Sequence, residues 1–256
     1  MTLKHTVMSL YDTLDDRLKA LSEAEFQYIE SNDISRASEL DHNCTGIYME
    51  ATVIYFAIKN QSFIIKEHGR RKMAKIHTLF HEVISAIAKQ NGCFVNCYSP
   101  ETFLIVYPGK EESVSVAVRT AMKIAFALSD TYKPLYADIP SIEFSMGIDH
   151  GHIMGTKSIT EIESDHITWF GSSIYKAKAI SKESARPYHI GVASIVFHNL
   201  EENLKIKEKR ILGIKKTVEL WNKVSYQLRT QKNIFTKPTT NSTLRKRHNK
   251  PTPASV

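Results

Sequence analysis

An eight-residue apolar run in the first quarter of the chain constrains the fold more than any other feature. It spans Ala51 to Ile58, reads Ala-Thr-Val-Ile-Tyr-Phe-Ala-Ile and contains no charged residue. β-Branched and aromatic side chains in such a run are typical of a buried strand. The run is far shorter than the roughly 20 apolar residues that a membrane span needs. We therefore predict a buried strand here, and no membrane segment.

The pattern after this strand alternates helices with strands. One helix is expected where apolar residues recur on a single face, with Asn91-Gly92 as its C-terminal cap; its apolar positions are Met73, Ile76, Phe80, Val83, Ile84 and Ile87. Two more helices are expected at Glu112–Leu128 and Ser172–Ser181, and strands at Cys93–Cys97, Thr102–Tyr107, Ile142–Ile148, His152–Met154, His189–Val192 and Thr217–Val224. This βαββαβ order predicts an α+β, ferredoxin-like domain, with an antiparallel-rich sheet and helices on one face.

The N-terminal region reads as helix. An apolar stripe recurs there at three- and four-residue spacing, formed by Val7, Leu10, Tyr11, Leu14, Leu18 and Leu21. A second short helix is expected at Ala24–Ile29. The stripe can pack on the main domain or pair with a partner's helix, and packing on the main domain is the default expectation.

The C-terminal region carries most of the net charge of +7. Six basic residues and no acidic one lie between Gln231 and Val256, which leaves about +1 for the rest of the chain. From about Thr230 the sequence has too few apolar residues to bury and is expected to be disordered. The basic stretch Arg245–Arg247 would bind phosphates only non-specifically. A solvated tail is therefore the expectation, and nucleic-acid binding is not.

The cysteines indicate the compartment. Cys44, Cys93 and Cys97 form no CxxC pair and no even framework, as is usual in a reducing cytosol. No basic stretch precedes an apolar one near the N-terminus, so export is not indicated. We expect a cytoplasmic protein.

Five segments, in order, resemble the catalytic domains of class III adenylyl and guanylyl cyclases. Val53–Ile58 is similar to that family's opening strand VxxFxDI, and Gly92–Tyr107 to its hairpin with a GD tip. Three later segments resemble GIxxG, IGxxVNxAxR and KGxxxPVxVY, namely Phe144–Gly151, Thr168–Ala179 and Leu212–Trp221. The Trp-Phe-Gly sequence at 169–171 and the helical N-terminus look most like the bacterial phage-defence cyclases that make cyclic pyrimidine nucleotides. The resemblance implies three parts: a helical extension (1–43), a cyclase homology domain (44–226) and a basic tail (227–256).

The resemblance also locates the residues that catalysis would need. In this family a ribose 3′-hydroxyl attacks its own α-phosphate with the help of two divalent ions, which two carboxylates hold. The first metal position falls on Ala57 and the second on Glu101; no acidic residue lies between Ala51 and Lys66. The base-selecting positions fall on Cys97 and Thr168. The ribose-orienting Asn and the transition-state Arg, which the partner subunit supplies, fall on Tyr175 and Ala179.

These substitutions predict a pseudo-cyclase. Lys176 and Lys178 lie near the Arg position, but one residue along a helix turns a side chain by about 100°, so neither is expected to replace the Arg. Too little positive charge, in metals or guanidinium, is expected to meet a triphosphate. Tyr175 and Trp169 are candidates to fill the space that a nucleotide would occupy.

Two functions follow from this pattern. The first is a regulatory or signalling module that forms a homodimer or pairs with another cyclase-type domain, with a nucleotide as a conceivable ligand and no cofactor. The alternative is a divergent cyclase that makes a 3′,5′-cyclic nucleotide. Its Mg²⁺ or Mn²⁺ would be held by Glu101, with Asp149 as the nearest candidate for a second acid.

Overall fold

The computed structural model describes residues 3–40, 44–90, 92–99, 101–138, 142–157, 167–184, 189–211, 214–219, 221–223 and 234–236. The strands are β1 (Gln27–Glu30), β2 (Thr45–Ile58), β3 (Phe94–Ser99), β4 (Thr102–Pro108), β5 (Phe144–Lys157), β6 (Ile167–Phe170), β7 (Ile190–Val192), β8 (Ile206–Ile211), β9 (Ile214–Glu219), β10 (Trp221–Lys223) and β11 (Ile234–Thr236). The helices are α1 (Leu3–Glu23), α2 (Gln61–His68), α3 (Arg70–Lys89), α4 (Glu112–Phe126), α5 (Ser172–Glu183), α6 (Ser194–His198) and α7 (Glu202–Lys205). The 3₁₀ turns η1 (Ile34–Glu39) and η3 (Lys133–Tyr136) and the π-helical turn η2 (Ala127–Thr131) connect them.

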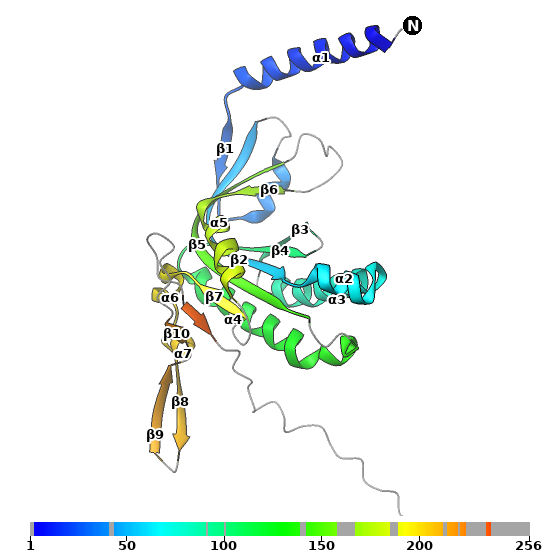
Figure 1. Cartoon of the computed structure of the whole chain (residues 1–256). Helices are drawn as coiled ribbons and strands as arrows, with labels where there is room; N and C mark the ends of the chain where they lie inside the picture. The colour runs from blue at the N-terminus through cyan, green and yellow to red at the C-terminus, as the bar shows by residue number, and fades with distance from the viewer. Residues whose placement is uncertain are drawn as a thin grey trace, which may run out of the picture.

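One sheet organises the described part of the molecule (Figure 1). Its strand order is β10-β11-β7-β5-β2-β4-β3, with β1 paired to β2 and β6 paired to β5. The strand pairs are antiparallel, apart from the parallel pairs β1–β2 and β5–β7. The predicted α+β class and antiparallel-rich sheet are confirmed.

The two longest strands, β2 and β5, form the middle of this sheet. They pair from Gly46 opposite Thr156 to Ile58 opposite Phe144. The apolar run within β2 is buried on both faces, since Val53, Ile54 and Phe56 are all 0% exposed. The strands predicted at Ile142–Ile148 and His152–Met154 are one continuous strand, because Gly151 pairs with Ala51 and does not turn the chain.

Helices cover both faces of the sheet. On one face α3 and α4 pack on Phe56 and Phe103, with the Phe56 and Phe80 rings 6.0 Å apart. On the other face α5 packs on β5 and β2, where Ile174 and Ala177 join Val53 and Tyr55 in a second apolar cluster. The sequence predicted helices on one face of the sheet only. That prediction is wrong for α5, which packs on the opposite face.

The position of α5 depends on a glycine in β5. A Cβ atom at Gly147 would overlap the carbonyl oxygen of Ala177, so only glycine lets the helix backbone approach this closely. Next to it, Oγ of Ser145 donates a hydrogen bond of 2.8 Å to the carbonyl oxygen of Ser181. The sequence resemblance included this glycine, and the structure gives its physical role.

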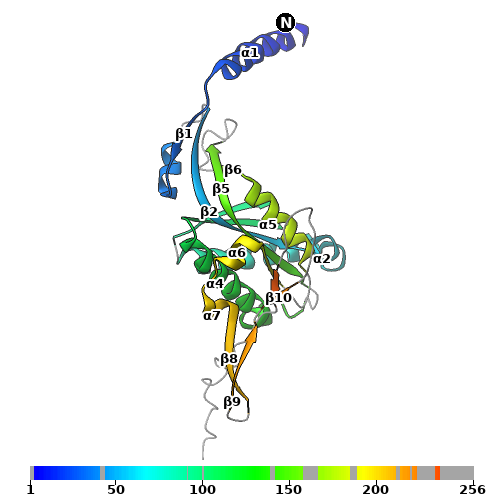
Figure 2. The ribbon, with the colours of Figure 1, turned by 90° about the vertical axis from the view of Figure 1, so that its left-hand side faces the viewer.

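The N-terminal segment differs from the prediction. A strand, β1, replaces the short helix expected at Ala24–Ile29, because it pairs in parallel with β2 and places Ile29 opposite Ile47. Figures 1 and 2 show α1 extending away from the body of the protein. Leu14 and Leu18 on α1 are 42% and 58% exposed. The expected packing of the stripe on the main domain is therefore wrong for these two residues.

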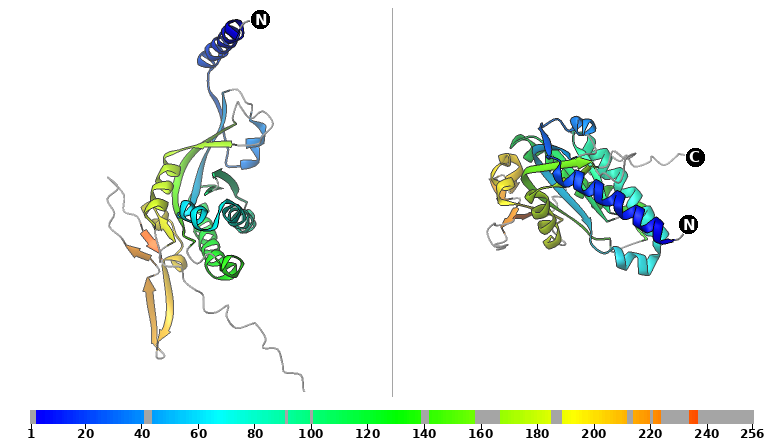
Figure 3. Two further views of the ribbon diagram at one scale, coloured as in Figure 1. Left: turned by 45° about the vertical axis from the view of Figure 1, so that its right-hand side comes forward. Right: turned by 90° about the horizontal axis from the view of Figure 1, so that it is seen from above.

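The C-terminal segment also differs. The strand expected at Thr217–Val224 is divided between β9 and β10. β8 and β9 form a separate hairpin that extends from the end of the body opposite α1 (Figure 3, left). Strand β11 pairs with β7 and β10 inside the segment expected to be disordered, so that prediction is wrong for residues 234–236. The basic stretch Arg245–Arg247 lies outside the described residues.

Membrane insertion was not expected from the sequence. Within the described residues, no helix has both the length and the apolar character that crossing a bilayer requires.

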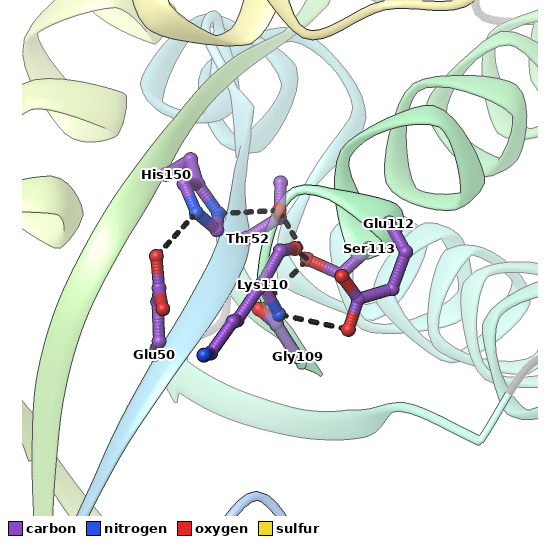
Figure 4. A network of polar contacts seen from close by, with 7 residues as sticks. All are labelled: Glu50, Thr52, Gly109, Lys110, Glu112, Ser113 and His150. Atoms are coloured by element: carbon purple, nitrogen blue, oxygen red, sulfur yellow. Dashed lines mark hydrogen bonds and ion pairs between the residues drawn. The ribbon is translucent and has the colours of Figure 1, made fainter.

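A buried polar network joins the central strands to the start of α4 (Figure 4). Nε2 of His150 lies 3.1 Å from a carboxylate oxygen of Glu50, and Nδ1 of His150 lies 3.0 Å from Oγ1 of Thr52. The Thr52 hydroxyl is in turn 2.6 Å from Oγ of Ser113, which donates to the carbonyl oxygen of Lys110 over 2.7 Å. The network fixes the turn between β4 and α4 against β2 and β5.

We expect Thr52→Val to lower the free energy of unfolding by about 1–3 kcal/mol, because it leaves Nδ1 of the buried His150 without its hydrogen-bond partner. Urea denaturation followed by circular dichroism measures the loss. Thr78→Val, at an exposed threonine on α3, is the matched control and should change stability by less than about 0.5 kcal/mol. Equal stability of the two variants would contradict a stabilising role for the network.

Candidate functional site

A groove lies between the end of β2, the β3–β4 hairpin, β6 and α5. Its volume is about 600 Å³, within the usual range for small-molecule sites. Its lining residues come from all four elements: Tyr55, Ala57, Ile58, Lys59, Ser99, Glu101, Thr102, Thr168, Trp169, Phe170, Ile174, Tyr175, Lys178, Ser181 and Lys182.

The structure brings four of the six predicted site residues into this groove: Ala57, Glu101, Thr168 and Tyr175. Ala57 pairs with Thr102, and the backbone N–H of Ile58 donates to the carbonyl oxygen of Glu101 over 2.8 Å. Glu101 therefore lies beside the end of β2, as the sequence mapping required. The side chain at the first metal position, Ala57, is a methyl group and has no oxygen for a metal ion.

The two other predicted site residues, Ala179 and Cys97, are not among the residues that line the groove. Ala179 is on α5 but is not among the residues that line it. Cys97 lies in β3 opposite Phe103, and its side chain is outside the described part of the structure.

The aromatic residues that were candidates to fill the groove do not close it. Tyr175 is 66% exposed at the rim. Trp169 is 4% exposed and packs against Phe94, with ring centroids 5.9 Å apart. The groove therefore remains open.

Three lysines line the groove, and the sequence reasoning missed their convergence. Lys59 follows β2 and donates through Nζ to the carbonyl oxygen of Lys182 over 2.5 Å. Nζ of Lys178 lies 5.8 Å from the centre of the Tyr55 ring. Burial is the main factor that lowers the pKa of Lys59; Glu143 opposes this, and the charge of Lys182 acts in the same direction as burial. The i,i+4 spacing of Lys178 and Lys182 was the available sequence signal.

The donor set of the groove does not fit a pair of divalent cations. Mg²⁺ and Mn²⁺ prefer several oxygen ligands with carboxylates among them, and the described lining offers one carboxylate beside three ammonium groups. No cluster of three or more His, Cys, Asp or Glu side chains with metal-binding geometry occurs in the described residues.

Asp149 cannot complete a metal site with Glu101. Asp149 pairs with Val53 on β2, whereas Glu101 lies beside Ala57 and Ile58. Four residues of strand separate these levels by about 13 Å, far more than one ion can bridge. The sequence-based suggestion that the two acids share a metal is wrong.

Asp149 is instead a buried carboxyl group on the face of β5 that α5 covers. It is 1% exposed, and burial raises its pKa to about 6, although the backbone N–H of His150 and the charge of Lys176 offset part of the effect. The folded protein therefore holds this proton more tightly than the unfolded chain. The contribution of Asp149 to stability falls as pH rises from about 4 to about 6.

We expect Asp149→Asn to raise the free energy of unfolding by roughly 1–3 kcal/mol at pH 8 and to have little effect at pH 4, since it removes an ionisation that folding opposes. Urea denaturation at several pH values measures the difference. Asp130→Asn, at an exposed position, is the control and should show no such pH dependence. A destabilised Asp149→Asn variant at pH 8 would contradict this assignment.

Comparisons with known proteins support the fold. No protein-family model matches the sequence, and no curated protein matches it. Among solved structures, a class III adenylyl cyclase-like ATP-binding protein from Pseudomonas aeruginosa has a TM-score of 0.61 at 13% identity, over 76% of this chain and 44% of that chain. A bacterial light-regulated adenylyl cyclase has a TM-score of 0.58 at 12% identity, over 93% and 65%. A dimeric guanylyl cyclase domain from the aquatic fungus Blastocladiella emersonii has a TM-score of 0.55 at 14% identity, over 75% and 96%.

The chain therefore has the fold of class III adenylyl and guanylyl cyclase catalytic domains. This confirms the fold that the five sequence segments implied. The groove between β2, the hairpin and α5 contains four of the six residues that those segments placed at functional positions, Ala57, Glu101, Thr168 and Tyr175.

Proposed function

We propose that this chain is a pseudo-cyclase, a cyclase-fold protein that does not form cyclic nucleotides and acts as a dimerising regulatory or signalling module. The main observation in support is the charge of the groove. Ala57 occupies the first metal position, and Lys59, Lys178 and Lys182 line the same space as Glu101. A role in phage defence remains a prediction from the sequence.

Cyclisation places two demands on a site that these residues do not meet. The ribose 3′-hydroxyl must lose a proton, and the charge that develops on the α-phosphate must be neutralised, which divalent ions accomplish together. An ammonium about 8 Å from a divalent ion raises the free energy of that ion by roughly 1–4 kcal/mol, for effective dielectric constants between 80 and 20. Three lysines therefore disfavour the ions, and the described lining offers one carboxylate where a pair of divalent ions needs at least two.

The transition state also lacks its expected partners. A transition-state arginine is worth on the order of 10³ or more in rate, and its position is Ala179. Tyr175, at the position of the ribose-orienting asparagine, is largely exposed at the rim. The missing metal carboxylate, the missing arginine and the missing asparagine all slow the same reaction, so their effects on its rate multiply.

We expect no 3′,5′-cyclic nucleotide when the full chain is incubated with ATP, GTP, CTP or UTP and either Mg²⁺ or Mn²⁺. Mass spectrometry of the nucleotide fraction measures the product, with an active class III cyclase as the positive control. The alternative, a divergent cyclase with its metal on Glu101, requires turnover that disappears in Glu101→Gln. Such turnover would overturn the proposal.

The dimerising role is supported by α1. Its apolar residues Val7, Tyr11, Leu14, Leu18 and Leu21 alternate four- and three-residue spacings, the pattern of a coiled-coil seam. Most of the stability of a helix in a protein comes from packing of its apolar face, and Leu14 and Leu18 are exposed. A second copy of the chain, or a cyclase-type partner with a similar helix, would cover this stripe. Among structures with the same fold, a guanylyl cyclase domain from Blastocladiella emersonii forms a non-canonical dimer, and a double mutant of that domain is monomeric.

We expect light scattering to give a dimer, and Leu18→Gln to raise its dissociation constant at least about tenfold, because an apolar side chain is lost from each helix of the seam. Lys19→Gln, one position away on the same helix, should leave the dimer unchanged. A strict monomer would contradict the dimeric module, and a dimer insensitive to Leu18→Gln would contradict the role of α1.

A further inference from the structure

The β8–β9 hairpin extends away from the body of the protein. Within the described residues, β8 and β9 pair only with each other. Figures 1 and 2 show the hairpin at the end of the body opposite α1. A two-stranded hairpin that stands alone in water is marginally stable at best. A surface that covers its outer end would therefore stabilise it.

The base of this hairpin is fixed to the body. Helix α7 leads into β8, and β10 follows β9. Trp221, at the start of β10, is 3% exposed, and its indole Nε1–H donates to the carbonyl oxygen of Leu204 over 2.7 Å. Leu204 belongs to the main apolar cluster. The end of the hairpin at its turn is therefore the free end.

Basic residues are concentrated in the hairpin. Its sequence, residues 206–219, contains five basic and two acidic residues, a net charge of +3, whereas residues 1–230 as a whole carry about +1. The rest of residues 1–230 is therefore net negative. The register opposes Arg210 to Lys215 and, one step farther from the turn, Lys209 to Lys216. Like charges directly opposite destabilise a strand pair, so an anionic partner at this end would remove a cost.

An apolar pair lies between these charges and the turn. Ile211 pairs with Ile214, beyond both basic pairs. With a rise of about 3.4 Å per residue, the basic pairs lie about 3 and 7 Å behind the isoleucines, and because successive residues alternate, the two basic pairs occupy opposite faces. Elements that bind bilayer surfaces place apolar residues about 5–10 Å into the boundary between headgroups and acyl chains, with basic residues on anionic headgroups. The order of residues toward the turn matches this arrangement.

Nucleic acid is the other polyanion that a basic hairpin could meet. A two-stranded ribbon fits the major groove of DNA, and a ribbon that lies lengthwise there has phosphates along its whole length. Toward the base of this hairpin the register includes Glu208 opposite Thr217 and Glu219 opposite Ile206. Lengthwise contact would bring both carboxylates to the phosphates. The distribution of charge thus favours end-on contact with a surface.

We propose that the turn end of the β8–β9 hairpin binds the surface of an anionic lipid bilayer. Ile211 and Ile214 reach the boundary between headgroups and acyl chains, and the two basic pairs contact the headgroups. This is surface contact and not a membrane span, for which the described part of the chain has no suitable helix. The inference goes beyond the proposed function and does not depend on the loss of catalysis. It adds a place in the cell where a regulatory module would act.

Flotation of the full chain with lipid vesicles tests this contact. We expect binding to phosphatidylcholine vesicles with about 30% phosphatidylserine to be at least about tenfold stronger than to phosphatidylcholine alone. Raising the salt from about 0.1 to 1 M should weaken it, because the screening length falls from about 10 to 3 Å.

Substitutions in the hairpin separate the charges from the apolar pair. Lys215→Gln and Lys216→Gln should each lower binding about fivefold, whereas Lys215→Arg and Lys216→Arg should retain it. Ile214→Ser should lower binding at least about tenfold, because the apolar contact is lost. Lys123→Gln, at an exposed lysine on α4, is the matched control and should bind like the unmodified chain. Circular dichroism verifies that each variant is folded.

Three results would overturn the inference: no binding to anionic vesicles, equal binding to neutral vesicles, or an equal loss in Lys123→Gln. Vesicle binding that Ile214→Ser leaves unchanged would also overturn it, because another basic or amphipathic segment of the chain would then be responsible. Binding of duplex DNA or RNA, without binding of anionic vesicles, would assign the hairpin to nucleic acid instead. Failure of the proposed function has a different signature, the appearance of cyclic product.

Discussion

The antiparallel pairing of β2 with β5 determines most of this structure. Each strand has 14 residues, and their register fixes which side chains face α3 and α4 and which face α5. The same register places Gly147 under α5, where the helix backbone needs space. Because β2 ends beside the β3–β4 hairpin, the pairing also determines where the groove forms. A shift of one residue would exchange the two faces of β2 and place each set of side chains against the wrong helices.

The sequence was sufficient for features that depend on local pattern. The run Ala51–Ile58 predicted a buried strand, and the helix through Phe80 followed from its apolar periodicity. The errors occurred where distant segments decide the outcome. Ala24–Ile29 resembles a helix by itself, but β1 forms by pairing with β2. Gly151 resembles a turn, but its partner Ala51 keeps β5 extended.

The same reasoning explains what could be predicted of the groove. Matching the chain to known motifs identified positions such as Ala57, Glu101 and Tyr175, because those segments have a fixed order. The lysine cluster was not predicted, because Lys59 and Lys182 are far apart in the sequence and meet only when α5 packs on the sheet. The separation of Asp149 from Glu101 also follows from register alone. Charges that folding brings together from distant segments are therefore not visible in local sequence motifs.

The central claim, that this groove does not hold divalent cations, is tested most directly by electron paramagnetic resonance of Mn²⁺. The signal of the free ion falls when the ion binds to protein. The account predicts no saturable loss of this signal on titration with the full chain. Stoichiometric binding of Mn²⁺ that disappears in Glu101→Gln would contradict it.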